Sequence, residues 1–172
     1  MARGDIKAGK STLIGATGEY FVMAELLRRG WLAGLTPRGA KSYDIIATME
    51  DRTIKVRVKT KTADANIFRW NLREDGRVFM GRIDKYDICV LVDLASVSPE
   101  YYVIPTSKVE KRLLELRQAW LDGKATRNPS NKVITFMLPQ DSEWLDRFKT
   151  WAAIDAIASV DGEAKARSGA AA

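Results

Sequence analysis

The sequence predicts an α/β fold, a single domain in which a mixed β-sheet is flanked by helices. Residues 13–29 carry apolar side chains at helical spacing and are followed by a glycine, which is typical of a helix and its end. Residues 42–48 and 54–61 are apolar or alternating runs separated by the polar turn 50–52, so they predict a β-hairpin. The apolar run 86–93 predicts a buried strand of the same sheet.

The remaining elements follow from the same two periodicities. We expect a third strand at 67–72, further strands at 100–104 and 133–138, and helices at 107–121 and 142–158. The domain is expected to cover residues 12–158. A basic arm at 1–11 and a disordered tail at 159–172, rich in Ala, Gly and Ser, would lie outside it.

Composition limits the chemistry. The net charge of +6 favours anionic partners. The absence of histidine excludes Ser-His and Cys-His catalysis and His-ligated zinc. The lone cysteine, Cys89, lies in an apolar run, so we expect a buried small hydrophobe and no disulfide within the chain. No apolar segment reaches the roughly 20 residues of a membrane helix, and no signal peptide is apparent. These features predict a soluble, cytoplasmic protein.

A cluster of cations on one strand predicts an anion-binding site. Strand side chains alternate between the two faces, so the run 54–61 sends four cations to one face and Val56 and Val58 to the other. The four cations are Lys55, Arg57, Lys59 and Lys61. Asp44 opens the preceding run, and the hairpin would bring it within reach of Lys59.

The first helix carries an acid on its apolar side. At 100° per residue, Glu19 falls on one arc with Val22, Met23, Leu26 and Leu27, so we expect its carboxylate to face inward. A carboxylate in an apolar environment needs a cation or a metal beside it. A catalytic role and a buried structural ion pair both satisfy this requirement.

In the order and spacing of these features the chain resembles the PD-(D/E)XK nuclease superfamily, and more closely a group of small bacterial restriction-endonuclease-like domains. The resemblance runs from about Thr12 to Pro105. Its landmarks are Gly18 and Glu19 opening a helix, residues 24–31, Pro37, Tyr43 and Asp44, residues 58–60, the strand 88–93 and residues 101–105.

The resemblance implies a restriction-endonuclease-like fold and metal-dependent hydrolysis of DNA. Asp44 and Glu19 would bind Mg²⁺ or Mn²⁺ with a backbone carbonyl at Val58, and Lys59 would lie beside the attacking water and the scissile phosphate. Phosphate contacts are expected from Arg38, Lys41, Lys55, Arg57 and Lys61. A homodimer would make double-strand cutting easiest.

Arg57 departs from the pattern of the superfamily. It stands where these proteins place Glu or Gln, and a guanidinium has no acceptor with which to coordinate a metal. In an active site, Arg57 would clamp a phosphate oxygen. Alternatively, Arg57 and Lys59 neutralise Asp44 and Glu19, and the protein is a catalytically inactive DNA-binding or protein-interaction module. An ordinary cross-strand pair between Asp44 and Arg57 is the third interpretation.

Overall fold

The computed structural model describes residues 11–37, 42–63, 65–123 and 128–159. Along the chain the elements are α1 (Ser11–Arg28), β1 (Leu32–Leu35), β2 (Ile45–Met49), β3 (Arg52–Lys61), β4 (Ile67–Asn71), β5 (Ile88–Asp93), β6 (Glu100–Pro105), α2 (Thr106–Asp122), β7 (Val133–Met137), α3 (Ser142–Asp146) and α4 (Ala152–Ser159). Residues 1–10 of the predicted arm and 160–172 of the predicted tail lie outside the described residues, as do Arg38 and Lys41. Ser11, predicted in the arm, begins α1, and Ser159, predicted in the tail, ends α4.

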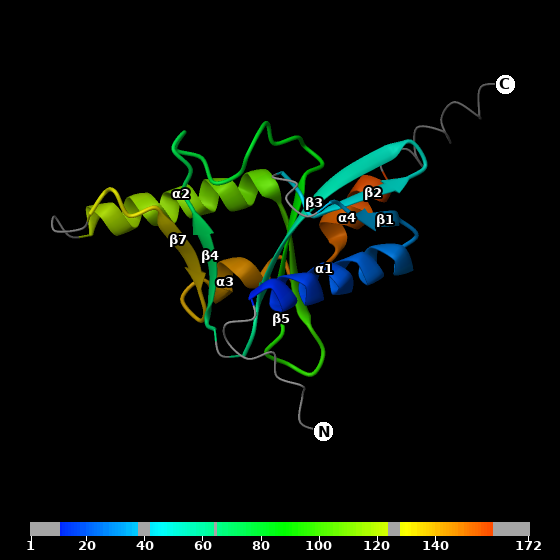
Figure 1. Cartoon of the computed structure of the whole chain (residues 1–172), viewed down its shortest axis with the longest axis horizontal. Coiled ribbons are helices and arrows are strands. Elements are labelled where there is room, and N and C mark those ends of the chain that lie inside the picture. Colours follow the sequence, from blue (N-terminus) through cyan, green and yellow to red (C-terminus); the bar gives the residue numbers. More distant parts are fainter. Residues whose placement is uncertain (1–10, 38–41, 64, 124–127, 160–172) are drawn as a thin grey trace.

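The central sheet has five strands in the order β1-β2-β3-β5-β6 (Figure 1). Its neighbours are antiparallel except β3 and β5, which run parallel and therefore need a crossover connection. That crossover carries β4 and a long loop. The prediction of a mixed sheet flanked by helices in an α/β domain is thus confirmed.

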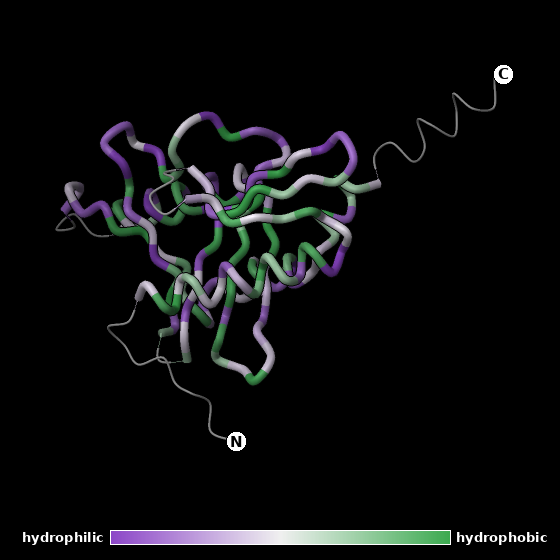
Figure 2. The backbone as a smooth tube through the Cα atoms, turned by 45° about the vertical axis from the view of Figure 1, so that its right-hand side comes forward, coloured by the Kyte–Doolittle hydropathy of each residue, from purple (hydrophilic) through white to green (hydrophobic). Residues whose placement is uncertain are grey.

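Each face of the sheet has its own core. On one face, α1 and α4 pack against the inward side chains of β3 and its neighbours, including Val22, Ile154 and Val56. On the other face, α2, α3 and the β4-β7 pair pack around Cys89 and Leu91 of β5. Figure 2 shows the apolar stretches gathered at the centre of the molecule and the hydrophilic ones in the outer loops. No helix within the described residues combines the length and apolar character that crossing a bilayer requires.

The predicted hairpin is present. Ile45 pairs with Val56 and Met49 with Arg52, so the turn consists of Glu50 and Asp51. Glu50 adopts a left-handed φ of 54°, a conformation that a tight turn requires and most residues avoid. As the alternation of side chains in β3 predicts, Val56 and Val58 pack on the face covered by α1, and Lys59 and Lys61 lie on the opposite face.

Three elements differ from the prediction. The segment 67–71 does not join the central sheet; it pairs with β7 in a separate two-stranded sheet. The physical reason is that β3 has β2 on one edge and β5 on the other, which leaves no edge for β4. The predicted helix 142–158 is divided into α3 and α4. The short strand β1 was not predicted, because Leu32–Leu35 has neither alternation nor β-branched residues.

Gly18 brings α1 into direct contact with β3. A Cβ atom at Gly18 would lie 1.9 Å from Thr60 Oγ1 and 3.0 Å from Thr60 Cβ, far closer than real atoms approach. The Thr60 hydroxyl is buried and has no hydrogen-bond partner among the described residues. Helix and strand therefore touch through a glycine and a small β-branched residue.

We expect Gly18→Ala to lower the free energy of unfolding by about 1–3 kcal/mol, because overpacking must displace one element from the other. The double variant Gly18→Ala with Thr60→Ala should recover part of this loss, since it removes the atom that the new methyl group meets. Gly15→Ala is the matched control, because no atom lies within 4 Å of its Cβ position. Urea unfolding of the four proteins measures the effect; equal loss in both glycine variants would contradict it.

Candidate active site

Asp44 is held at the point where β2 separates from β3. Its backbone N–H donates to the carbonyl of Val56 at 2.9 Å, and its carbonyl accepts from the N–H of Thr36 at 2.9 Å. Its Oδ2 accepts a hydrogen bond from the N–H of Val58 at 2.7 Å. The carboxylate thus continues the strand pairing in place of a backbone carbonyl, and its position is determined by the main chain of β3.

The carbonyl of Val58 lies beside this carboxylate, on an edge of β3 that β2 does not pair. The N–H and C=O of one strand residue point to the same edge, so the carbonyl of Val58 lies on the edge that its N–H presents to Asp44. Asp44 Oδ1 accepts no hydrogen bond from the residues that the structure describes. This edge of β3 therefore offers one carboxylate oxygen and one backbone carbonyl to a ligand.

Lys59 lies on the face of β3 opposite to α1, partly buried. Its ammonium lies 5.8 Å from the centroid of the Trp70 ring. Within the described part of the chain no carboxylate forms an ion pair with it. Burial lowers the pKa of Lys59, the charge of Arg57 lowers it further, and the charge of Asp44 acts in the opposite direction. A partly buried ammonium without an ion pair is costly, and an anionic ligand would relieve that cost.

Arg57 shares this face of β3. Its Nε donates to the carbonyl of Ser42 at 3.1 Å, which ties β3 to the segment preceding Asp44. Its guanidinium carbon lies 5.7 Å from the centroid of the Phe79 ring. A small pocket beside Arg57 is lined by residues from four parts of the chain: Ser42, Tyr43, Lys55, Phe79, Met80, Ile83, Asp87, Ile88 and Thr106. The charges of Arg57 and Asp44 both act on Lys59, so these three side chains lie near one another.

Cys89 lies beside this group on the neighbouring strand, since its register partner in β3 is Arg57. It is fully buried, and burial raises the pKa of its thiol to about 12. A thiol that stays protonated is neither a nucleophile nor a metal ligand. The predicted role of Cys89 as a buried hydrophobe is confirmed.

Glu19 approaches β3 from the other face. The buried residues of α1 are Gly18, Val22 and Leu26, so the buried face is centred closer to Gly18 than the predicted arc was. Glu19 is consequently only partly buried, and Leu27 is exposed. Because α1 covers the face that carries Thr60, Glu19 and the Lys59 side chain start from opposite faces of the sheet. A metal-binding role for Glu19 stays a prediction.

Among the described residues, no three acidic, cysteine or histidine side chains are grouped so as to bind a metal. The donor set still fits one kind of Mg²⁺ site, in which one or two carboxylates bind the ion and water and substrate phosphate supply the other ligands. Asp44 Oδ1 and the Val58 carbonyl are hard oxygen donors of that kind. They fit an ion completed by substrate, not a closed protein site.

The other predicted cations fall into three groups. The predicted phosphate contact of Lys61 is wrong. Lys61 is 5% exposed and its Nζ lies 2.6 Å from Asp93 Oδ2, so it cannot reach DNA. The cause is register, since Lys61 and Asp93 are partners at the ends of two parallel strands. Lys55 is partly exposed and its Nζ lies 3.1 Å from Asp84 Oδ2. Arg38 and Lys41 fall outside the described residues.

Comparison with models of known protein families found no match, and neither did a search of curated proteins. Similar solved structures include a bacterial homing endonuclease, at 18% identity and a TM-score of 0.43, covering 60% of this chain and 74% of that one. They also include Hjc of Archaeoglobus fulgidus, a Holliday junction resolvase, at 12% identity and a TM-score of 0.39, covering 72% and 84%. At this level of similarity we draw no functional conclusion from either structure.

Proposed function

We propose that this protein is an endonuclease that hydrolyses phosphodiester bonds in DNA at the site formed by Asp44, Lys59 and the carbonyl of Val58. The observation that carries the proposal is Lys59, a partly buried cation without an ion pair in the described chain, beside a carboxylate anchored on the main chain of the same strand. A phosphate group would supply the missing negative charge. The cationic face around Arg57 also favours a polyanion.

In the proposed reaction, water attacks phosphorus and gives up a proton to solvent, a P–O bond to the sugar breaks, and the leaving oxygen takes a proton from solvent. Lys59 would donate hydrogen bonds to the water and to a phosphate oxygen and so orient the nucleophile. Arg57 would bind a second phosphate oxygen through its planar guanidinium. Mg²⁺ or Mn²⁺, when bound at Asp44 and the Val58 carbonyl, would polarise the phosphate and lower the pKa of the water.

We expect Asp44→Asn to reduce cleavage at least about 100-fold, the scale of losing one positioned charged group. Asparagine retains an oxygen that can accept from the Val58 N–H, so the fold should persist while the charge is removed. The assay uses plasmid and branched DNA across a Mg²⁺ series, with EDTA, and Asp122→Asn on the exposed end of α2 as control. Undiminished cleavage by the Asp44 variant would contradict the proposed site.

A second candidate function is a DNA-binding module without hydrolysis. Arg57 favours it, because a cation occupies the strand position at which the resemblance requires an acceptor, and the described residues contain no three-acid group. Such a module would bind DNA and leave it intact at every Mg²⁺ concentration. A two-fold dimer would suit either function, and light scattering of the protein with and without DNA tests for it.

A further inference from the structure

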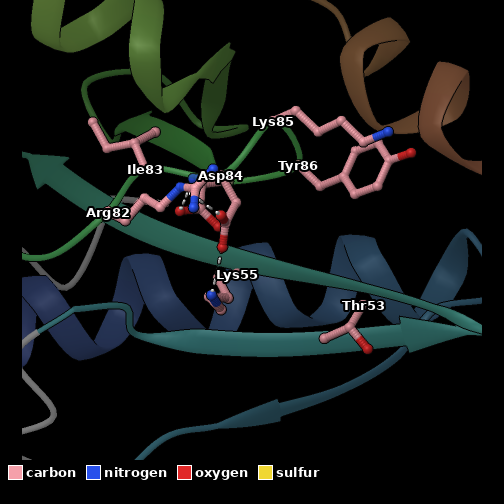
Figure 3. Close-up of a pocket in the computed structure, with 8 residues that line it drawn as sticks. Thr53, Lys55, Arg82, Ile83, Asp84, Lys85 and Tyr86 are labelled. Carbon is pink, nitrogen blue, oxygen red and sulfur yellow. Dashed lines mark hydrogen bonds and ion pairs between the residues drawn. The ribbon is translucent and has the colours of Figure 1, made fainter.

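The loop that leads into β5, residues 80–87, forms a second pocket with the outer half of β3. The pocket measures about 450 Å³ and is lined by Thr53, Lys55, Arg82, Ile83, Asp84, Lys85, Tyr86 and Asp87. Figure 3 shows Lys55 on the strand below Asp84, with Arg82 beside the same carboxylate and Lys85 extending past Tyr86. Three cations and two carboxylates from two segments distant in sequence thus line one pocket.

Asp84 holds this arrangement together. Its Oδ2 lies 3.1 Å from Lys55 Nζ and its Oδ1 lies 3.9 Å from Arg82 Nε. Its backbone N–H donates to Asp87 Oδ2 at 3.0 Å, which closes the loop on itself. The hydrogen bond to Asp84 raises the pKa of Lys55, so this lysine stays charged. The Arg82 side chain is 94% exposed, so most of its donors are available to a ligand.

This pocket continues the candidate active site. Lys55, Ile83 and Asp87 also line the small pocket beside Arg57. Alternate residues of a strand lie about 7 Å apart on one face. Lys59, Arg57 and Lys55 therefore form a row of cations along β3, and the row leads directly to the loop that carries Arg82 and Lys85.

We propose that Lys55, Arg82 and Lys85 form a track for the sugar-phosphate backbone of double-stranded DNA next to the cleaved bond. The inference rests on the proposed function and identifies the flank of its substrate. Sites for single strands stack bases on open aromatic rings. Here the Lys85 ammonium lies 4.4 Å from the Tyr86 ring centroid, and Tyr86 is the sole aromatic residue lining the described pocket. The pocket thus offers charge for phosphates and no free stacking surface, which favours duplex over single strand.

The test combines Arg82→Ala with Lys85→Ala and measures affinity for a 30-base-pair duplex by fluorescence anisotropy over a range of salt concentrations. Each lost phosphate contact lowers the slope of log affinity against log salt by about 0.9, so the double variant should lose about 1.8. The matched control, Arg28→Ala with Arg147→Ala, removes the same charge from α1 and from the segment after α3, neither of which lines the pocket.

The outcomes separate the two proposals. If the parent binds duplex and the Arg82→Ala, Lys85→Ala variant (the loop variant) keeps the parent's slope of log affinity against log salt, the track is wrong and the proposed function stands. If control and loop variants lose equal slope, general charge explains binding and the track is again wrong. A larger effect on single-stranded DNA than on duplex would also overturn it. If the parent binds no DNA, the proposed function fails and the track fails with it.

Discussion

Replacing Lys59 by methionine is expected to lower DNA cleavage about 10²- to 10⁴-fold and, at the same time, to stabilise the fold. The loss of activity follows from removing the group that orients water and phosphate. The gain in stability follows from burial, which lowers the pKa of Lys59 below its ordinary value of 10.5. At neutral pH the folded protein must bury a charge that the unfolded chain keeps in water, and methionine removes that cost.

The pH dependence of this effect has a definite sign. The folded pKa of Lys59 is lowered, so between that pKa and 10.5 the unfolded chain binds more protons than the folded protein. The stability that Lys59 contributes therefore rises with pH across this window. The advantage of Lys59→Met should be full at neutral pH and should shrink as the pH approaches 10.5.

Urea unfolding at pH 7 and pH 10, combined with plasmid cleavage, measures both effects. Lys111→Met is the control, because Lys111 is an exposed lysine of α2. A Lys59 variant that still cleaves would remove this residue from the proposed mechanism. A variant that unfolds more easily at pH 7 would show that the ammonium has a stabilising partner.

Arg57 separates an active nuclease from an inactive relative. If Arg57 binds the scissile phosphate, Arg57→Ala should lower cleavage about 10²- to 10³-fold, and Arg57→Glu at least as far, because the new acid also repels phosphate. Both variants lose the hydrogen bond to the Ser42 carbonyl, so circular dichroism must first establish that each remains folded. Cleavage is then compared on plasmid and branched DNA across a Mg²⁺ series.

The opposite pattern would support the DNA-binding module. If Arg57 occupies a vacated ligand position, Arg57→Glu places a second carboxylate near Asp44 and should increase Mg²⁺ affinity. Cleavage would then appear in this variant and be absent from the parent. No cleavage by parent or variants, together with no Mg²⁺ binding, would reject the proposed endonuclease.

Local signals determined the central part of the site. The alternation of Lys and Val in β3 and the polar turn at Glu50 specify a hairpin, and a hairpin pairs residues that are close in sequence. Asp44 must then lie near β3, because few residues separate them. Prediction succeeded here since the relevant contacts are short in range.

Only the tertiary structure decided which cations are available to a ligand. Lys61 and Lys55 belong to the same alternating face, yet Lys61 is buried against Asp93 and Lys55 meets Asp84 at the surface. Both acids are about 30 residues away in sequence, and β3 acquires them through its parallel pairing with β5 and through the loop before it. Strand periodicity specifies the face to which a side chain points. It carries no information about which distant segment covers that face, and that depends on the packing of the whole chain.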